Sequence, residues 1–148
     1  LCDVMSKKYI PRDNGNEDSG ATVLVELIAQ AIGLLQQMST SNRNIEDITT
    51  ALPLLEFINL FVEYHIERCI STSTRHSKTA AVMEVFLNEL SNLTRQCTVP
   101  DYLHKLCLIW KGLFEDESAK AAVLNNENCL QAGFHIFQVG LFQYNSNL

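Results

Sequence analysis

The stretch Leu54–Arg68 constrains this chain more than any other, because nearly everything outside one polar stripe is apolar. The polar residues recur at helical spacing and line one narrow face, which consists of Glu56, Asn59, Glu63 and Glu67. An ordinary surface helix buries one face, whereas a helix in a stacked array is covered on several sides. The stretch therefore predicts a central helix that packs against more than one neighbour.

The other apolar residues also recur at intervals of three and four, and polar connectors separate the segments that carry them. This pattern predicts an all-α chain that forms one segment, with helices at about residues 1–8, 21–38, 50–69, 80–96, 100–114 and 121–144. The hairpin period of roughly 40 to 50 residues is in the range of HEAT and armadillo units. We therefore expect an α-solenoid of HEAT-like helical hairpins, and a plain helical bundle is the alternative with similar helix lengths.

Prolines and turn-forming residues set the expected helix ends. The segment 11–20 is rich in turn formers and acids, which predicts a loop. Pro53 is expected in the first turn of the central helix, with a kink or break at Leu52, because a proline deeper in a helix removes a backbone hydrogen bond. Thr98 is the expected N-cap of the helix that has Pro100 in its first turn.

Charge and composition argue against several functional classes. The chain of 148 residues has a net charge of −6 and no basic cluster longer than Lys7–Lys8, so it lacks the basic face of a nucleic-acid-binding protein. No apolar run approaches the ~18 residues of a membrane span. The five cysteines are widely spaced without a CxxC pair, so we expect reduced core thiols rather than a zinc or redox site. Because the first residue is Leu1 rather than Met, we expect a fragment or a processed piece.

Residue types that support catalysis occur only as scattered single residues. The four histidines are isolated in the sequence, and His65 and His135 fall on mostly apolar helices, where a hydrogen-bonded core histidine is the expected role. No glycine-rich phosphate loop or triad order is present. We therefore expect no enzymatic activity, no cofactor and no metal. A small helical enzyme is the alternative, which a stoichiometric metal or nucleotide would reveal.

Aromatic and glycine residues are predicted to serve helix packing. Gly133 and Gly140 lie seven residues apart, on one side of a helix, and each lowers helix propensity by about 1 kcal/mol relative to alanine. Close approach of a neighbouring helix is the usual compensation. The aromatic residues expected in the core rather than in a ligand site are Phe57, Phe61, Phe86, Trp110, Phe114, Phe134 and Phe137.

Taken along its whole length, the chain resembles the exportins of the importin-β (karyopherin) superfamily. No single motif is specific, and it is the collinear order of the matches that carries the resemblance. These matches are Val4–Lys7 with Pro11, Gly33–Gln36, Phe57, Leu60–Val62, His65, Arg68, Cys107, Ile109–Trp110, Phe114, Ala122–Asn125, Glu127 and Gln143–Asn145.

The resemblance implies a middle segment of a nuclear export receptor that shuttles between nucleus and cytoplasm. The implied partners are Ran bound to GTP, nucleoporins and a protein cargo. Within the family the resemblance points to members that carry actin with profilin, which implies actin–profilin as cargo. The alternative is a generic helical-repeat scaffold for protein interactions that has no role in transport.

The resemblance also implies where the partners would bind. The helices at 21–38, 80–95 and 121–144 would lie on the inner, concave side of the superhelix, where Ran and cargo are held. The hypothesised contact stripe on the second of these helices is polar and predicted to point away from the core. It consists of Glu84, Asn88, Ser91 and Arg95.

Overall fold

The computed structural model describes residues 17–40 and 48–146, and this part of the chain is all-α. Every described residue is helical except those in the connectors 74–76, 97–99, 116 and 125–126. The helices of the described part are α2 (Glu17–Thr40), α3 (Ile48–Ser73), α4 (Ser77–Gln96), α5 (Pro100–Glu115), α6 (Glu117–Leu124) and α7 (Glu127–Ser146). The prediction of an all-α chain is thereby confirmed for these residues.

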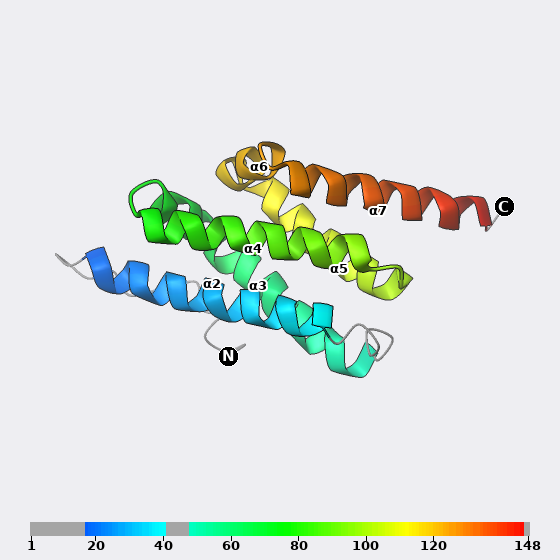
Figure 1. The fold of residues 1–148 in the computed structure, drawn as a ribbon, viewed down its shortest axis with the longest axis horizontal. Coiled ribbons are helices and arrows are strands. Elements are labelled where there is room, and N and C mark those ends of the chain that lie inside the picture. The colour runs from blue at the N-terminus through cyan, green and yellow to red at the C-terminus, as the bar shows by residue number, and fades with distance from the viewer. Residues whose placement is uncertain (1–16, 41–47, 147–148) are drawn as a thin grey trace.

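The helices are arranged in two layers (Figure 1). Helices α2, α4 and α7 lie side by side in one layer, in which α4 contacts α2 on one side and α7 on the other. Helices α3 and α5 pack against each other and pass behind the first layer in the view of Figure 1. Within each layer the helices in contact are therefore not consecutive along the chain: α3 separates α2 from α4, α4 separates α3 from α5, and α5 and α6 separate α4 from α7.

Helix α3 is covered by several neighbouring helices, as its sequence predicts. It contacts α2, α4, α5 and α6. Of its predicted polar stripe, Glu56, Glu63 and Glu67 are exposed and Asn59 is partly buried. The remaining side chains on α3 are mostly buried, so one narrow face of this helix meets water.

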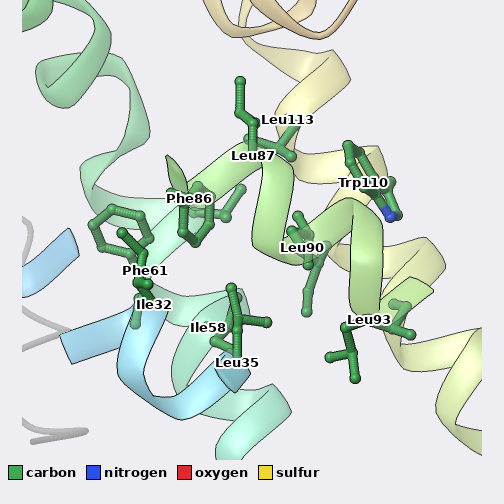
Figure 2. Close-up of a cluster of buried hydrophobic side chains, with 14 of the residues drawn as sticks. Ile32, Leu35, Ile58, Phe61, Phe86, Leu87, Leu90, Leu93, Trp110 and Leu113 are labelled. Carbon is green, nitrogen blue, oxygen red and sulfur yellow. The ribbon is translucent and has the colours of Figure 1, made fainter. Parts of the chain in front are cut away.

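The core lies where α2, α3, α4 and α5 meet (Figure 2). Phe61 of α3 and Phe86 of α4 are fully buried, with ring centroids 5.4 Å apart in an edge-to-face arrangement. Aromatic pairs in this geometry contribute about 0.5–1.5 kcal/mol beyond the burial of their area. The aliphatic side chains drawn around the pair include Leu35, Ile58 and Leu90, which join the three helices into one core.

The helices predicted to start near residues 21, 50 and 80 start earlier in the structure, α4 at Ser77. Residues 17–20 belong to α2, so the loop predicted over 11–20 is wrong for that part, while residues 11–16 and the helix predicted at 1–8 lie outside the described residues. Helix α3 begins at Ile48 and is continuous through Pro53, so the break expected at Leu52 is absent. Pro53 is exposed, and the lost backbone hydrogen bond lies near the helix start, where packing of the following apolar turns offsets it.

The connector before α5 also differs in detail. Pro100 occupies the start of α5 as expected, but the N-cap residue is Val99 rather than Thr98. Valine has no side-chain acceptor, so only its extended backbone sets the helix start, and its carbonyl accepts from Leu103 N at 2.9 Å. Proline at the first position fixes φ in the helical range without needing a donor there.

The single helix predicted over residues 121–144 is wrong, because two helices, α6 and α7, cover this region. Asp116 caps α6, with its carboxylate accepting from Ala119 N at 2.9 Å. The chain then turns at Asn125 and Asn126, and the Asn126 side chain accepts from Cys129 N at 3.2 Å, in the first turn of α7. Short polar side chains of this kind compete with the helical ladder by bonding to nearby backbone groups.

Candidate partner-binding surfaces

The predicted contact stripe on α4 lies largely against α7. Ser91 is fully buried, and its hydroxyl oxygen lies 2.7 Å from the Leu87 carbonyl oxygen and 3.3 Å from Cys129 Sγ on α7. The expectation that the whole stripe points away from the core is therefore wrong for Ser91. The polar stripe predicted that this serine is exposed. A serine side chain is also small enough to fit a close contact between two helices.

Asn88 and Arg95 continue this contact on either side of Ser91. The Asn88 side-chain oxygen accepts from the side-chain amides of Asn126 at 3.2 Å and Asn128 at 3.0 Å. The Arg95 guanidinium donates to Gln131 Oε1 at 2.8 Å and to Asn92 Oδ1 at 2.7 Å. Both side chains thus bond to residues at or after the start of α7.

Glu84 is exposed in the structure. It lies in the N-terminal half of α4, and Arg95 is exposed near the C-terminal end of the helix. The structure therefore brings Asn88, Ser91 and Arg95 into one helix–helix interface and leaves Glu84 at its edge. Binding of a partner by the four residues stays a prediction.

Trp110 links the two layers, and His135 links α7 to the connector between α4 and α5. Trp110 Nε1 of α5 donates to Thr94 Oγ1 of α4 at 3.0 Å, and both side chains are buried. His135 of α7 shares a hydrogen bond of 2.8 Å between Nε2 and the Cys97 carbonyl oxygen. His65 is buried beside Phe61, with ring centroids 6.4 Å apart. His135 thus has the hydrogen-bonded structural role that its apolar helix predicted.

An open groove of about 380 Å³ runs between α3 and α5. Carboxylates line it from both helices, with Glu63 and Glu67 on α3 and Glu115 at the end of α5. Its apolar lining includes Val62, and Gly112 of α5 comes so close that an added Cβ would lie 2.9 Å from Val62 Cγ1. The sequence shows these acids on separate helices, and only the packing of α3 on α5 brings them together.

The outer face of α7 is apolar and exposed. Phe134 and Phe137 are 68% and 65% exposed, and Leu130 on the same face is 43% exposed. The prediction that these two phenylalanines belong to the core is wrong, and Phe114, 41% exposed, is a further exception. The opposite face of α7, with Cys129 and Ala132 buried, lies toward α4. The sequence does indicate a second apolar face, since apolar residues recur at spacings of three and four on both faces of this helix.

Gly133 belongs to this exposed face of α7. Among the described residues, no atom outside its immediate surroundings lies within 4 Å of a Cβ built on Gly133 or on Gly140. The close helix approach that the two glycines predict is therefore not made by the described part of the chain. The α7 outer face, defined as Leu130, Gly133, Phe134 and Phe137, is the largest departure of the structure from the sequence prediction.

The cysteine thiols of the described residues are at least partly buried, and Cys2 lies outside these residues. Cys69, Cys97 and Cys129 are buried, and Cys107 is partly buried. Burial raises the pKa of Cys69 to about 12, against a weaker lowering by the charge of Arg68. Burial also raises the pKa of Cys97, Cys107 and Cys129. A raised pKa disfavours the reactive thiolate.

The described residues include neither a candidate metal site nor a candidate membrane-spanning helix. None of their His, Cys, Asp and Glu side chains form a group of three or more that could hold a metal ion. Within the same residues, no helix combines the length and the apolar character that crossing a membrane requires.

Comparison of the chain with protein-family models, with curated proteins and with solved structures found no match. The resemblance to exportins stays a prediction that rests on the collinear residues given above.

Proposed function

We propose that this chain is part of a helical-repeat receptor for nuclear export, as its resemblance to exportins implies. The observation that supports the proposal best is the alternating packing of α2, α4 and α7 in one layer and α3 and α5 in the other. Helical-repeat proteins stack successive hairpins in this way, so that each helix layer forms one wall of an extended surface. Such surfaces bind proteins rather than small substrates. A HEAT-like superhelix is the architecture that we propose for the larger receptor.

The mechanism that follows is a population shift in a superhelix. Ran loaded with GTP and the cargo each favour the same curvature, so the binding of one raises the affinity for the other. Hydrolysis of GTP in the cytoplasm removes this coupling and releases both partners. In this proposal actin–profilin is the cargo, nucleoporins are transient partners, and the receptor shuttles between nucleus and cytoplasm.

The layer that contains α4 is the proposed partner-binding wall. Three of the predicted stripe residues bond to α7, so within the stripe Glu84 is the carboxylate that a partner can reach. Charged groups at the edge of an interface mostly affect the association rate and its salt dependence. Glu84 therefore gives a modest but specific test of this wall.

The experiment is a pull-down of nuclear extract on the complete natural polypeptide, with Ran loaded with a non-hydrolysable GTP analogue or with GDP. Recovery of actin and profilin only with the GTP form supports the proposal and its cargo. If Ran does not bind in either form, the export function is wrong. Glu84→Ala is expected to slow Ran or cargo association by about two- to tenfold at low salt. Glu56→Ala, which removes an exposed carboxylate from α3 in the other layer, is the matched control.

The alternative function is a helical-repeat scaffold without a role in transport. The same layered packing supports it, since stacked helices alone do not require Ran. The two functions differ in the same pull-down. A scaffold retains its protein partners whether Ran carries GTP or GDP, whereas an export receptor loses them with GDP.

A further inference from the structure

The α7 outer face has the residue pattern of a surface on which another helix packs. Leu130, Phe134 and Phe137 are separated by four and three residues, which is the spacing by which two helices pack along a shared seam. Between Asn128 and Gly140 no residue carries a formal charge when His135 is neutral. Interfaces deplete charge at their centre and enrich aromatic residues, and this face has both properties.

The glycine in this face adds a second, independent observation. Gly133 is exposed, and a Cβ placed on it would meet only open space among the described residues. A glycine inside a helix costs about 1 kcal/mol relative to alanine unless it serves packing. Its position beside Phe134 offers a neighbouring helix a shallow site next to a protruding aromatic ring.

The order of the layer indicates what covers this face. Helix α4 packs with one side on α2 and with the other on α7, and its side chains are apolar or hydrogen-bonded on both. Helix α7 likewise carries apolar residues on two sides. Within the described residues it packs on α4 and α6, and its outer face stays exposed. The uncovered side of α7 thus lies where the next helix of the α2–α4–α7 layer would pack.

The area argues for a covalently connected neighbour. A phenylalanine side chain carries about 150–250 Å², so the exposed parts of Phe134 and Phe137 amount to roughly 200–330 Å². A standard interface between separate chains buries about 800 Å² on each partner, so these two rings alone would supply less than half of one partner's share. A helix in the same polypeptide needs less area, because its effective concentration is high.

We propose that the α7 outer face is covered by a further helix of the same polypeptide, amphipathic and with an uncharged apolar stripe, which extends the α2–α4–α7 layer. This inference rests on the stacked architecture of the proposed function but not on binding of Ran. A second copy of the chain and a separate partner protein are the other possible occupants.

The test is cysteine labelling of the complete natural polypeptide. Phe134→Cys places a thiol on the α7 outer face, and Val85→Cys, at an α4 position that is 43% exposed, is the matched control. A maleimide labels both variants, and peptide mass spectrometry separates the new thiols from the native cysteines. We expect Cys at position 134 to react at least about tenfold more slowly than Cys at position 85, because labelling requires local opening. Light scattering should give a monomer, and protection should not change on dilution.

Three results would overturn the inference. Equal labelling of the two positions in the purified polypeptide means that no intramolecular helix covers the face. Protection that disappears on dilution, or that accompanies a dimeric mass, assigns the face to a second copy. Equal labelling that becomes protection only on addition of extract assigns it to a separate protein. Because the labelling needs no Ran, failure of the Ran pull-down with position 134 protected would refute the export function alone.

Discussion

A hydrogen bond between two buried side chains joins α4 to α5. Trp110 Nε1 donates to Thr94 Oγ1 at 3.0 Å, and the same threonine oxygen donates to the Leu90 carbonyl at 2.8 Å. Removing the donor leaves a buried oxygen with fewer partners and a space where the larger ring was. Trp110→Phe should lower the free energy of unfolding by about 2–4 kcal/mol, measured by urea denaturation.

A double-mutant cycle separates the hydrogen bond from the packing. Thr94→Val keeps the size of the side chain but removes the oxygen, and it should cost about 1–2 kcal/mol. If the bond matters, the double variant should be about 1 kcal/mol less destabilised than the sum of the single variants. Strict additivity would show that the indole stabilises this site through its volume alone.

The buried thiol of Cys69 predicts a loss of stability at alkaline pH. Desolvation raises its pKa from 9.0 to about 12, so above pH 9 the folded state holds a proton that the unfolded state releases. The contribution of this thiol to stability is therefore complete below pH 9 and is lost as the pH rises toward 12. Each pH unit in this window should weaken it by at most about 1.4 kcal/mol.

Cys69→Ala isolates this effect from the titration of tyrosines and lysines. At pH 7 the variant should be less stable than the parent by about 0.5–3 kcal/mol, because it loses a buried group. From pH 9 upward the difference in the free energy of unfolding should shrink, and chemical denaturation at pH 7, 9 and 10 measures it. A difference that is constant across these pH values would contradict a raised pKa.

At the scale of the elements, two glycines that both lie inside helices have different surroundings. A Cβ on Gly112 of α5 would lie 2.9 Å from Val62 Cγ1 of α3, whereas Gly133 of α7 faces open space among the described residues. Valine is stiff about χ1, so it cannot move aside easily. Gly112→Ala should therefore destabilise the chain by about 1 kcal/mol, since the strain of about 1–3 kcal/mol exceeds the gain in helix propensity.

Gly133→Ala is the matched control, and in the 148-residue chain it should stabilise by up to about 1 kcal/mol. Val62→Ala costs stability by itself, but in that background Gly112→Ala should become neutral or stabilising. Thermal unfolding measures the stability of Gly112→Ala, Gly133→Ala, Val62→Ala and the double variant of Val62 and Gly112. A Gly112→Ala variant as stable as Gly133→Ala would mean that α5 can move away from α3 at little cost.

Prediction from the sequence is correct for a helix whose apolar period has one explanation. It fails where the same period fits either one long helix or two shorter ones. The apolar positions of Leu54–Arg68 specify a helix that several neighbours cover, and α3 confirms this. In residues 121–144 the helical period continues across Asn125 and Asn126, and the turn depends on the Asn126 bonds to Cys129 N and to the Asn88 side chain. The second of these partners lies on another helix, so local sequence could not reveal it.

The same reason limits prediction of the candidate surfaces. Ser91 and Asn88 have the spacing of an exposed polar stripe, and their contacts with Cys129 and Asn128 depend on the order in which helices stack. Phe134 is a large apolar residue of the kind usually found in a core. It is exposed because the other side of α7 meets α4. Periodicity identifies an apolar face, but the neighbour that covers that face is a property of the whole layer.

At the scale of the whole molecule, stability should decrease from the centre of the stack toward α7. Helix α3 contacts four other helices and shares the core aromatic pair with α4, whereas α7 packs mainly on α4 with one face exposed. In stacked architectures each unit is stabilised chiefly by its nearest neighbours, so an end helix opens with less free energy than a central one. The arrangement therefore predicts a gradient of local stability rather than one uniform value.

Amide hydrogen exchange followed by mass spectrometry tests this gradient. In the 148-residue chain, peptides from α3 and α4 should exchange slowest and those from α7 fastest. Phe86→Ala, which empties the fully buried centre, should cost about 3–5 kcal/mol and raise exchange in α2, α3 and α4 together. Phe134→Ala removes a ring that is 68% exposed and should change stability by less than about 0.5 kcal/mol. If α7 is protected as strongly as α3, nearest-neighbour stacking does not govern this molecule, because a helix with one covered face would then be as stable as one with several.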